Sequence, residues 1–137
     1  MAVFVDTSAL YAAFDRGDSS HSRAVDLLSR EGARVTSDHV IVELWLLTKA
    51  RAGLAIAESS VAAVRRGGVE IESILLADLE AAWETGRAFI DQTFSLVDRT
   101  SFAVMERLGL NRVVSFDDDF AIYRYGPRRD RAFELLR

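Results

Sequence analysis

Several residue types are absent from the sequence or nearly so. Its 137 residues include no cysteine, and Pro127 and Lys49 are its only proline and lysine. Without cysteine, a disulfide framework, a zinc-cysteine site and a thiol nucleophile are excluded. No low-complexity tract or linker is present, and half of the residues are apolar. We therefore expect residues 1–137 to form a single domain that is stabilised by an ordinary apolar core.

Long apolar runs are also missing. The longest lies near residues 40–47 and is interrupted by Glu43, which makes it far too short to span a membrane. The start, MAVFVDTS, has no basic leader, so we expect a cytoplasmic protein with no membrane partner. The formal net charge of −4 argues against a uniformly basic surface but leaves room for a local basic rim.

Apolar periodicity and turn residues predict alternating strands and helices. The expected strands are 2–5, 34–36, 69–71, 112–116 and 133–136, and the expected helices are 7–14, 21–30, 39–52, 54–66, 77–90 and 99–108. This order is typical of an α/β three-layer sandwich with a short, mostly parallel central sheet flanked by helices. The helix at 39–52 is apolar almost all round, so we expect it to be central, with Trp45 and Trp83 in the core.

Four acidic residues stand among apolar neighbours: Asp6, Glu43, Asp98 and Asp117. An unpaired buried carboxylate costs several kcal/mol or becomes protonated, so a fold that buries several usually supplies a cation. Three of them follow expected strands or open an expected helix, and ligands collect at the carboxyl edge of a parallel sheet. Oxygen ligands without cysteine suit Mg²⁺, which points to phosphodiester hydrolysis.

Each acid also has an ordinary explanation. Asp6 and Asp98 can be helix N-caps, and Asp117 can belong to a polar turn with its two following aspartates. Glu43 lies mid-helix with no fixed positive charge one turn away, so a partner from another helix is the alternative to a metal. Ser8 and Ser115 are either hydroxyls that support the acids or capping and turn residues.

The C-terminal region offers a second feature. Arginines alternate with tyrosines there and either bind RNA phosphate and stack a base or form a solvated tail: Tyr123, Arg124, Tyr125, Arg128, Arg129 and Arg131. The Ala-rich helices near residues 50–64 are either partner surface or internal packing.

Four segments carry a family resemblance: VFVDTSALYA, VIVELWLLTKA, SLVDRTSFAVMERLG and RVVSFDDDF. In this order and at these spacings the chain resembles the PIN-domain ribonucleases, and within them the small VapC-type toxins of type II toxin-antitoxin systems. The resemblance covers nearly the whole chain. It places the family's four acidic ligands on Asp6, Glu43, Asp98 and Asp117, with Ser8 as the supporting hydroxyl.

The resemblance implies a PIN-like fold and an endoribonuclease that depends on Mg²⁺ or Mn²⁺ and uses metal-activated water to leave 5′-phosphate and 3′-hydroxyl ends. It also implies an RNA substrate, a cognate antitoxin and a homodimer. The alternatives are a PIN nuclease of RNA processing or DNA-flap cleavage and a catalytically silent protein-binding module. A phosphoacceptor domain of receiver type is disfavoured, because Lys49 lies mid-chain instead of late.

Overall fold

Five parallel strands form one sheet in the order β3-β2-β1-β4-β5. The computed structural model describes residues 2–137. Its strands are β1 (Ala2–Val5), β2 (Ala33–Ser37), β3 (Glu70–Glu72), β4 (Arg112–Val114) and β5 (Glu134–Leu136). Its helices are α1 (Thr7–Phe14), α2 (His21–Arg30), α3 (Asp38–Ala52), α4 (Leu54–Arg66), α5 (Leu76–Ala88), α6 (Leu96–Leu108) and α7 (Asp119–Ile122). The expected α/β sandwich is confirmed.

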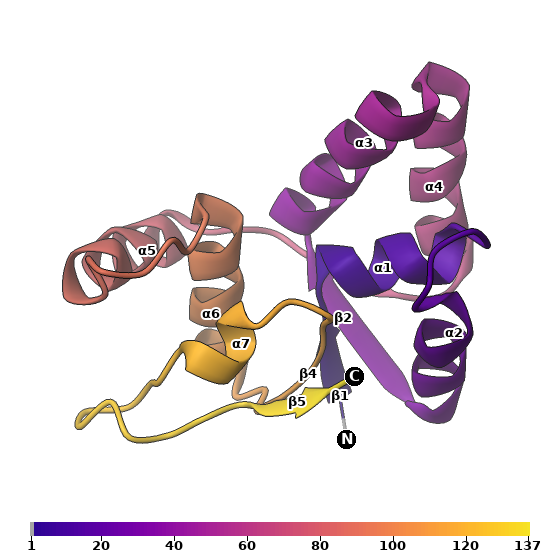
Figure 1. Ribbon diagram of the computed structural model, residues 1–137. Helices are drawn as coiled ribbons and strands as arrows, with labels where there is room; N and C mark the ends of the chain where they lie inside the picture. The colour runs from indigo at the N-terminus through magenta and orange to yellow at the C-terminus, as the bar shows by residue number, and fades with distance from the viewer. Residues whose placement is uncertain (1) are drawn as a thin grey trace.

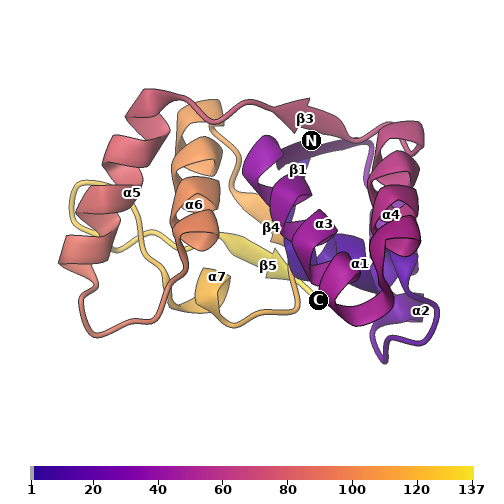
Figure 2. The ribbon, with the colours of Figure 1, turned by 90° about the horizontal axis from the view of Figure 1, so that it is seen from above.

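The helices divide between the two faces of the sheet. Helices α1 to α4 lie on one side and α5 to α7 on the other (Figures 1 and 2). Right-handed crossovers explain this division, because the chain moves outward from β1 to β3 and then returns past β1 to β4 and β5. The direction reverses between β1 and β4, and ligands bind at such switch points in parallel sheets.

The core is centred on the strands and on α6. Phe4 and Val113 lie opposite each other on β1 and β4, and both are fully buried. Phe102 of α6 stacks on Tyr123 with 4.0 Å between the ring centroids. Tyr123 is thereby buried, which excludes for this residue both alternatives that the sequence left open, base stacking and a solvated tail, and Tyr125 stacks on Phe133 of the same cluster.

Helix α3 is less buried than its sequence predicts. It packs against α4 as a helical hairpin that rises from the sheet (Figure 1), and its fully buried positions are Val40 and Leu44. Val42 is 58% exposed and Leu46 is exposed beside it. The helix is central in that it packs against α1, α4, α6 and β2, but one apolar face of it stays exposed.

The two tryptophans are not core residues. Trp83 is 59% exposed on α5. Trp45 is half-buried on α3, and its indole N–H donates to Glu58 Oε1 over 3.1 Å. Apolar spacing on a helix therefore marks a face that is available for packing without showing that the face is covered. Within residues 2–137, no helix has the length and apolar character needed to cross a membrane.

Several element ends differ from the prediction. Helix α6 begins at Leu96 with Ser95 as its N-cap, so Asp98 lies in the first turn and does not open the helix. Strand β4 ends at Val114 instead of residue 116, and β3 begins one residue later than expected. Helix α7 was not predicted. Its four residues are too short to show helical periodicity in sequence.

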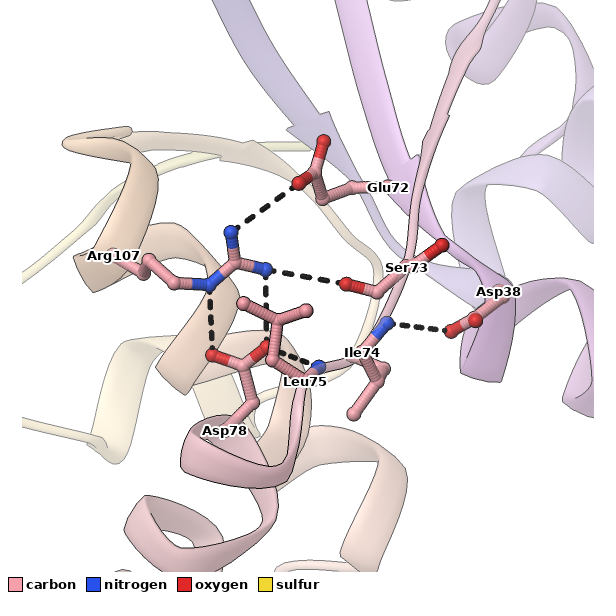
Figure 3. A network of polar contacts seen from close by, with 7 residues as sticks. All are labelled: Asp38, Glu72, Ser73, Ile74, Leu75, Asp78 and Arg107. Carbon is pink, nitrogen blue, oxygen red and sulfur yellow. Dashed lines mark hydrogen bonds and ion pairs between the residues drawn. The ribbon is translucent and has the colours of Figure 1, made fainter.

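A polar network ties α6 to the segment that enters α5 (Figure 3). Arg107 of α6 binds both carboxylate oxygens of Asp78, with Nε–Oδ1 and Nη2–Oδ2 distances of 3.0 Å. It also reaches Glu72 Oε1 and the Ser73 carbonyl, each at 3.2 Å. Asp78 accepts the Leu75 N–H over 2.8 Å. The network holds α6, which carries Asp98, against the end of β3.

The start of α3 is held in a similar way. Ser37 caps the helix by accepting the Val40 N–H over 3.2 Å. Asp38 accepts the Ile74 N–H from the segment before α5 over 3.1 Å (Figure 3). These two contacts connect α3 to the end of β2 and to the segment that follows β3, and they help to place the helix that carries Glu43.

Candidate active site

Asp6 is the most buried acid of the candidate site. It follows β1 directly, and its backbone N–H continues the sheet by donating to the Val114 carbonyl over 3.0 Å. It occupies the N-cap position of α1, yet its side chain makes no capping hydrogen bond. The side chain is available for another role, although the residue as a whole is only 1% exposed.

Hydroxyl groups are the main partners of the Asp6 carboxylate. Ser115 Oγ donates to Asp6 Oδ2 over 2.8 Å, and Ser8 Oγ donates to the same oxygen over 3.2 Å. Burial, together with the negative charges of Asp117 and Asp98, raises the pKa of Asp6 to about 7, although the Ser115 hydrogen bond opposes the shift. The charged form of Asp6 is therefore disfavoured, and a nearby cation would stabilise it.

The same two serines shape the turn after β4. Ser8 Oγ accepts the Phe116 N–H over 2.9 Å, and Ser115 Oγ accepts the Asp117 N–H over 3.1 Å. Both hydroxyls therefore join the ends of β1 and β4 across the switch point. Ser115, for which a turn role and a supporting role were both open in sequence, fulfils both.

Asp98 reaches the site from the first turn of α6. It forms a capping box with Ser95, in which the Ser95 N–H donates to Asp98 Oδ2 over 2.9 Å and the Asp98 N–H donates to Ser95 Oγ over 3.1 Å. Burial raises the pKa of Asp98, and the charge of Glu43 raises it as well. The capping explanation and the site explanation therefore hold together, because Asp98 caps and still faces other acids.

Asp119 is a fifth acid of the cluster, and the sequence analysis missed it as a site residue. Its pKa is raised to about 6 by burial first and then by the neighbouring carboxyl group of Asp98. The spacing Asp117-x-Asp119 before a buried Phe120 is the signal that could have found it, since both ends of a three-residue turn can face one side.

Asp117 is the more open of these two acids. It is exposed at the mouth of the site, and burial and the charges of Asp119 and Asp118 raise its pKa. Asp118, between them, points elsewhere and pairs with Arg137 at 2.7 Å. Of the triple aspartate, two carboxylates therefore belong to the cluster and one to an ion pair.

The predicted residues come together, but not as a tight ligand cage. The charges of Asp117 and Asp98 raise the pKa of Asp6, and the charge of Glu43 on α3 raises that of Asp98. Across residues 2–137, no three acidic or histidine side chains meet closely enough to hold one ion directly. In the same range no Arg or Lys pairs with any of the five acids Asp6, Glu43, Asp98, Asp117 and Asp119.

This arrangement fits a hard divalent cation. Mg²⁺ keeps several of its waters and is usually bound through one or two carboxylates together with substrate phosphate, so it does not require three converging side chains. The donors are all oxygens, and their pKa values are raised by burial first and then by the charges of neighbouring acids. His39 donates or accepts at Thr100 Oγ1 over 3.2 Å and is not part of the cluster.

A cleft of about 510 Å³ opens beside the acids. Glu43, Asp117 and Ser8 line one end of it, and the loop before α2 lines the other. Glu43 is half-buried there, not enclosed among apolar side chains as its sequence neighbours indicate. The cleft gives an extended ligand access to the switch point.

Comparison with known proteins identifies the class. The model of the PIN domain family matches residues 3–124, and the chain therefore belongs to the PIN-domain family. The resemblance to VapC-type toxins is likewise confirmed by individual relatives. The chain is 39% identical over 121 residues to the 23S rRNA-specific endonuclease VapC20 of Mycobacterium tuberculosis, which covers 87% of this chain and 92% of that protein.

Further relatives agree. Ribonuclease VapC26 of M. tuberculosis is 25% identical over 116 residues, covering 84% of this chain and 86% of that protein. The crystal structure of M. tuberculosis VapC20, described as a sarcin-ricin loop cleaving toxin, superposes with a TM-score of 0.81 at 35% identity, over 88% of this chain and 93% of that one. VapBC2 from Rickettsia felis, bound to a promoter DNA fragment, has a TM-score of 0.67 at 14% identity over 98% and 97%, which shows a shared fold.

Proposed function

We propose that this chain is an endoribonuclease that depends on Mg²⁺ or Mn²⁺ and acts as the toxin of a toxin-antitoxin pair. The observation that carries the proposal is the state of Asp6: it is buried at the switch point, repelled by neighbouring acids and, among residues 2–137, without a cationic partner. An acid in this position costs stability and is explained by the binding of a cation.

The residues that would hold the metal are Asp6, Glu43, Asp98 and Asp117, directly or through water. When bound, the ion supplies positive charge that activates water and neutralises the phosphodiester during in-line attack. Ser8 and Ser115 orient Asp6 through its Oδ2 atom. The capping box fixes Asp98 through its Oδ2 atom, which accepts the Ser95 N–H.

Asp119 lies next to Asp98 in this site, and burial and the neighbouring Asp98 raise its pKa to about 6. Both carboxyl groups would have to be deprotonated to hold a metal ion. Asp119 is therefore a further candidate ligand.

RNA cleavage by purified protein tests the proposal. The first substrate to use is an RNA with the sarcin-ricin loop of 23S rRNA, because the relative VapC20 is described as acting there. Cleavage is expected with Mg²⁺ or Mn²⁺, and is expected to be lost in EDTA and in Asp98→Asn. Asp118→Asn is the matched control, since Asp118 is the neighbouring acid that pairs with Arg137. Full cleavage by Asp98→Asn removes the catalytic assignment.

The toxin role has its own support and test. Solved toxin-antitoxin complexes such as that from Klebsiella pneumoniae share this fold, and apolar side chains stand exposed on the α3–α4 hairpin as a surface for an antitoxin or a second copy: Val42, Leu46, Leu54 and Ile56. Expression is expected to arrest growth unless the product of a neighbouring small open reading frame is co-expressed. Harmless expression of an active nuclease favours the processing role instead.

A further inference from the structure

One face of α3 connects the acids to the far end of the cleft. Glu43, Leu47 and Arg51 are four residues apart, so they lie on the same side of the helix, and all three line the cleft. At the rise of an α-helix, the backbone positions of Glu43 and Arg51 are about 12 Å apart. A ligand that extends from the acids along α3 therefore reaches Arg51.

Arg51 is held in place by an aromatic ring. Its guanidinium lies over the ring of Tyr11, 4.7 Å from the ring centroid. Tyr11 is itself anchored, because its hydroxyl donates to Asp15 Oδ2 over 2.8 Å. Stacking uses the flat face of a guanidinium and leaves the N–H groups at its edge free to donate. The side chain is exposed on its outer side.

The nearby carboxylates do not neutralise Arg51 by direct pairing. Asp15 Oδ1 accepts the Gly17 N–H over 2.9 Å, so both Asp15 oxygens already have donors. Asp18, which also lines the cleft, accepts the Ser20 N–H over 2.8 Å. Within residues 2–137, no carboxylate lies within ion-pair distance of Arg51.

The charges of the cleft make this arginine distinctive. Of the residues that line the cleft, Arg51 is the one cation, while Glu43, Asp117 and Asp18 are anionic. A strand of RNA is repelled by such acids unless positive charge holds it nearby. The metal would neutralise the phosphate that lies beside the acidic residues. A phosphate further along the strand needs a hydrogen-bond donor from the protein.

We propose that Arg51 binds a backbone phosphate of the RNA that flanks the cleaved phosphodiester and thereby positions the strand along α3. This rests on the proposed function, because it takes the cleft as the RNA site. Arg51 is a substrate-binding residue of this site and takes no part in the bond cleavage. Its planar fork suits the bidentate recognition of a phosphate, and its place over Tyr11 limits the entropy that is lost on binding.

RNA binding without cleavage tests this. The equilibrium constant for a single-stranded RNA is measured at several salt concentrations in EDTA, and the RNA is recovered intact. Arg51→Ala is expected to weaken binding by about tenfold and to reduce the slope of log K against log salt by about 0.7, the value for one lost phosphate contact on a single strand. Arg51→Lys should retain the slope and recover part of the affinity.

Arg65→Ala is the matched control, because Arg65 is an exposed arginine of α4 that does not line the cleft. Equal affinity and slope for Arg51→Ala and Arg65→Ala would overturn the assignment. In steady-state cleavage, Arg51→Ala should raise KM and leave kcat unchanged, and a fall in kcat alone would contradict a binding role. If the wild-type protein binds RNA but never cleaves it, the nuclease proposal fails while the salt comparison still decides on Arg51.

Discussion

Asp6 and Asp78 are both almost fully buried, at 1% and 2% exposure, and differ in what surrounds them. Arg107 forms a bidentate ion pair with Asp78, and this contact raises the pKa of Arg107 (Figure 3). The carboxylate of Asp6 accepts hydrogen bonds from serine hydroxyls and lies near other acidic side chains. Asp78 has its cation within the fold and is structural, whereas we propose that Asp6 is kept to bind a cation from outside.

The largest expected effect comes from Asp6→Asn. Removing a ligand of the proposed metal should lower the RNA cleavage rate by roughly 100-fold or more, since loss of an outer-shell partner alone costs 10- to 100-fold. The metal-free protein should be at least as stable as wild type, because the amide removes an unpaired buried charge. Cleavage rates and thermal unfolding in EDTA check both parts. Retained cleavage would end the proposed difference between the two aspartates.

Asp78→Asn should show the opposite pattern. Breaking a largely buried ion pair leaves Arg107 without its partner and should lower the free energy of unfolding by about 3 kcal/mol. Urea unfolding measures this, and cleavage per folded molecule at low temperature should remain within a few-fold of wild type. Arg23→Ala serves as the control, because its pair with Asp26 lies on an exposed helix surface. A large loss of activity without a loss of stability would show that Asp78 belongs to the site.

The pH dependence of stability should separate Asp6 from the rest of the chain. An unfolded aspartate loses its proton near pH 4, whereas folded Asp6 retains it to about pH 7. Folded Asp6 holds its proton through this window while unfolded Asp6 does not, so the contribution of Asp6 to the free energy of unfolding is fully present below about pH 4 and is lost as the pH rises through about 7. Melting temperatures in EDTA at about pH 5 and about pH 8 measure the fall.

The variant Asp6→Asn should show a smaller fall than wild type between these pH values, with a remainder from Asp98, Asp117 and Asp119, whose pKa values are also raised. Adding Mg²⁺ should stabilise wild type more at the higher pH, because the ion binds the folded state after the protons have left. Equal falls in wild type and variant would contradict the assignment of the raised pKa to Asp6.

The smallest effect is expected from Ser115→Ala. It removes the 2.8 Å hydrogen bond to Asp6 Oδ2 and the contact with the Asp117 N–H. The pKa of Asp6 should rise further, because that hydrogen bond favours the charged form. The rate of RNA cleavage should fall by about tenfold, as for a residue that orients a metal ligand. The free energy of unfolding should change by about 1 kcal/mol. A pH profile of cleavage that does not move would show that Ser115 orients the turn only.

Local sequence patterns predicted the order of the elements, and β1 and the helices α1, α2 and α4 have the expected bounds. The same patterns were less accurate for burial and for helix ends, which depend on contacts with neighbouring residues. Trp83 carries an apolar helical pattern and is exposed, because nothing in residues 2–137 covers that face of α5. Asp98 was expected to open its helix, but Ser95 caps first, and both residue types are good N-caps.

The residues of the candidate site could be predicted from their type, because acidic residues among apolar neighbours are unusual, but their contacts in the fold could not. Asp6, Glu43, Asp98 and Asp117 were singled out because acids among apolar residues are costly, and this cost is a property of the sequence alone. Asp119 was missed because a run of three aspartates contains no sign of which ones face inward. Only the pairing of Asp118 with Arg137 sorts the three.

By itself, the sequence determined the α/β order of the chain and the presence of more buried acids than nearby cations, because periodicity and charge are local and can be counted. Tertiary structure decided which acids meet, since the reversal between β1 and β4 brings Asp6 beside Ser115 from 109 residues away. It also decided that Arg107 neutralises Asp78 and not Asp6. Coulomb energy depends on distance in space, and only the folded chain sets that distance.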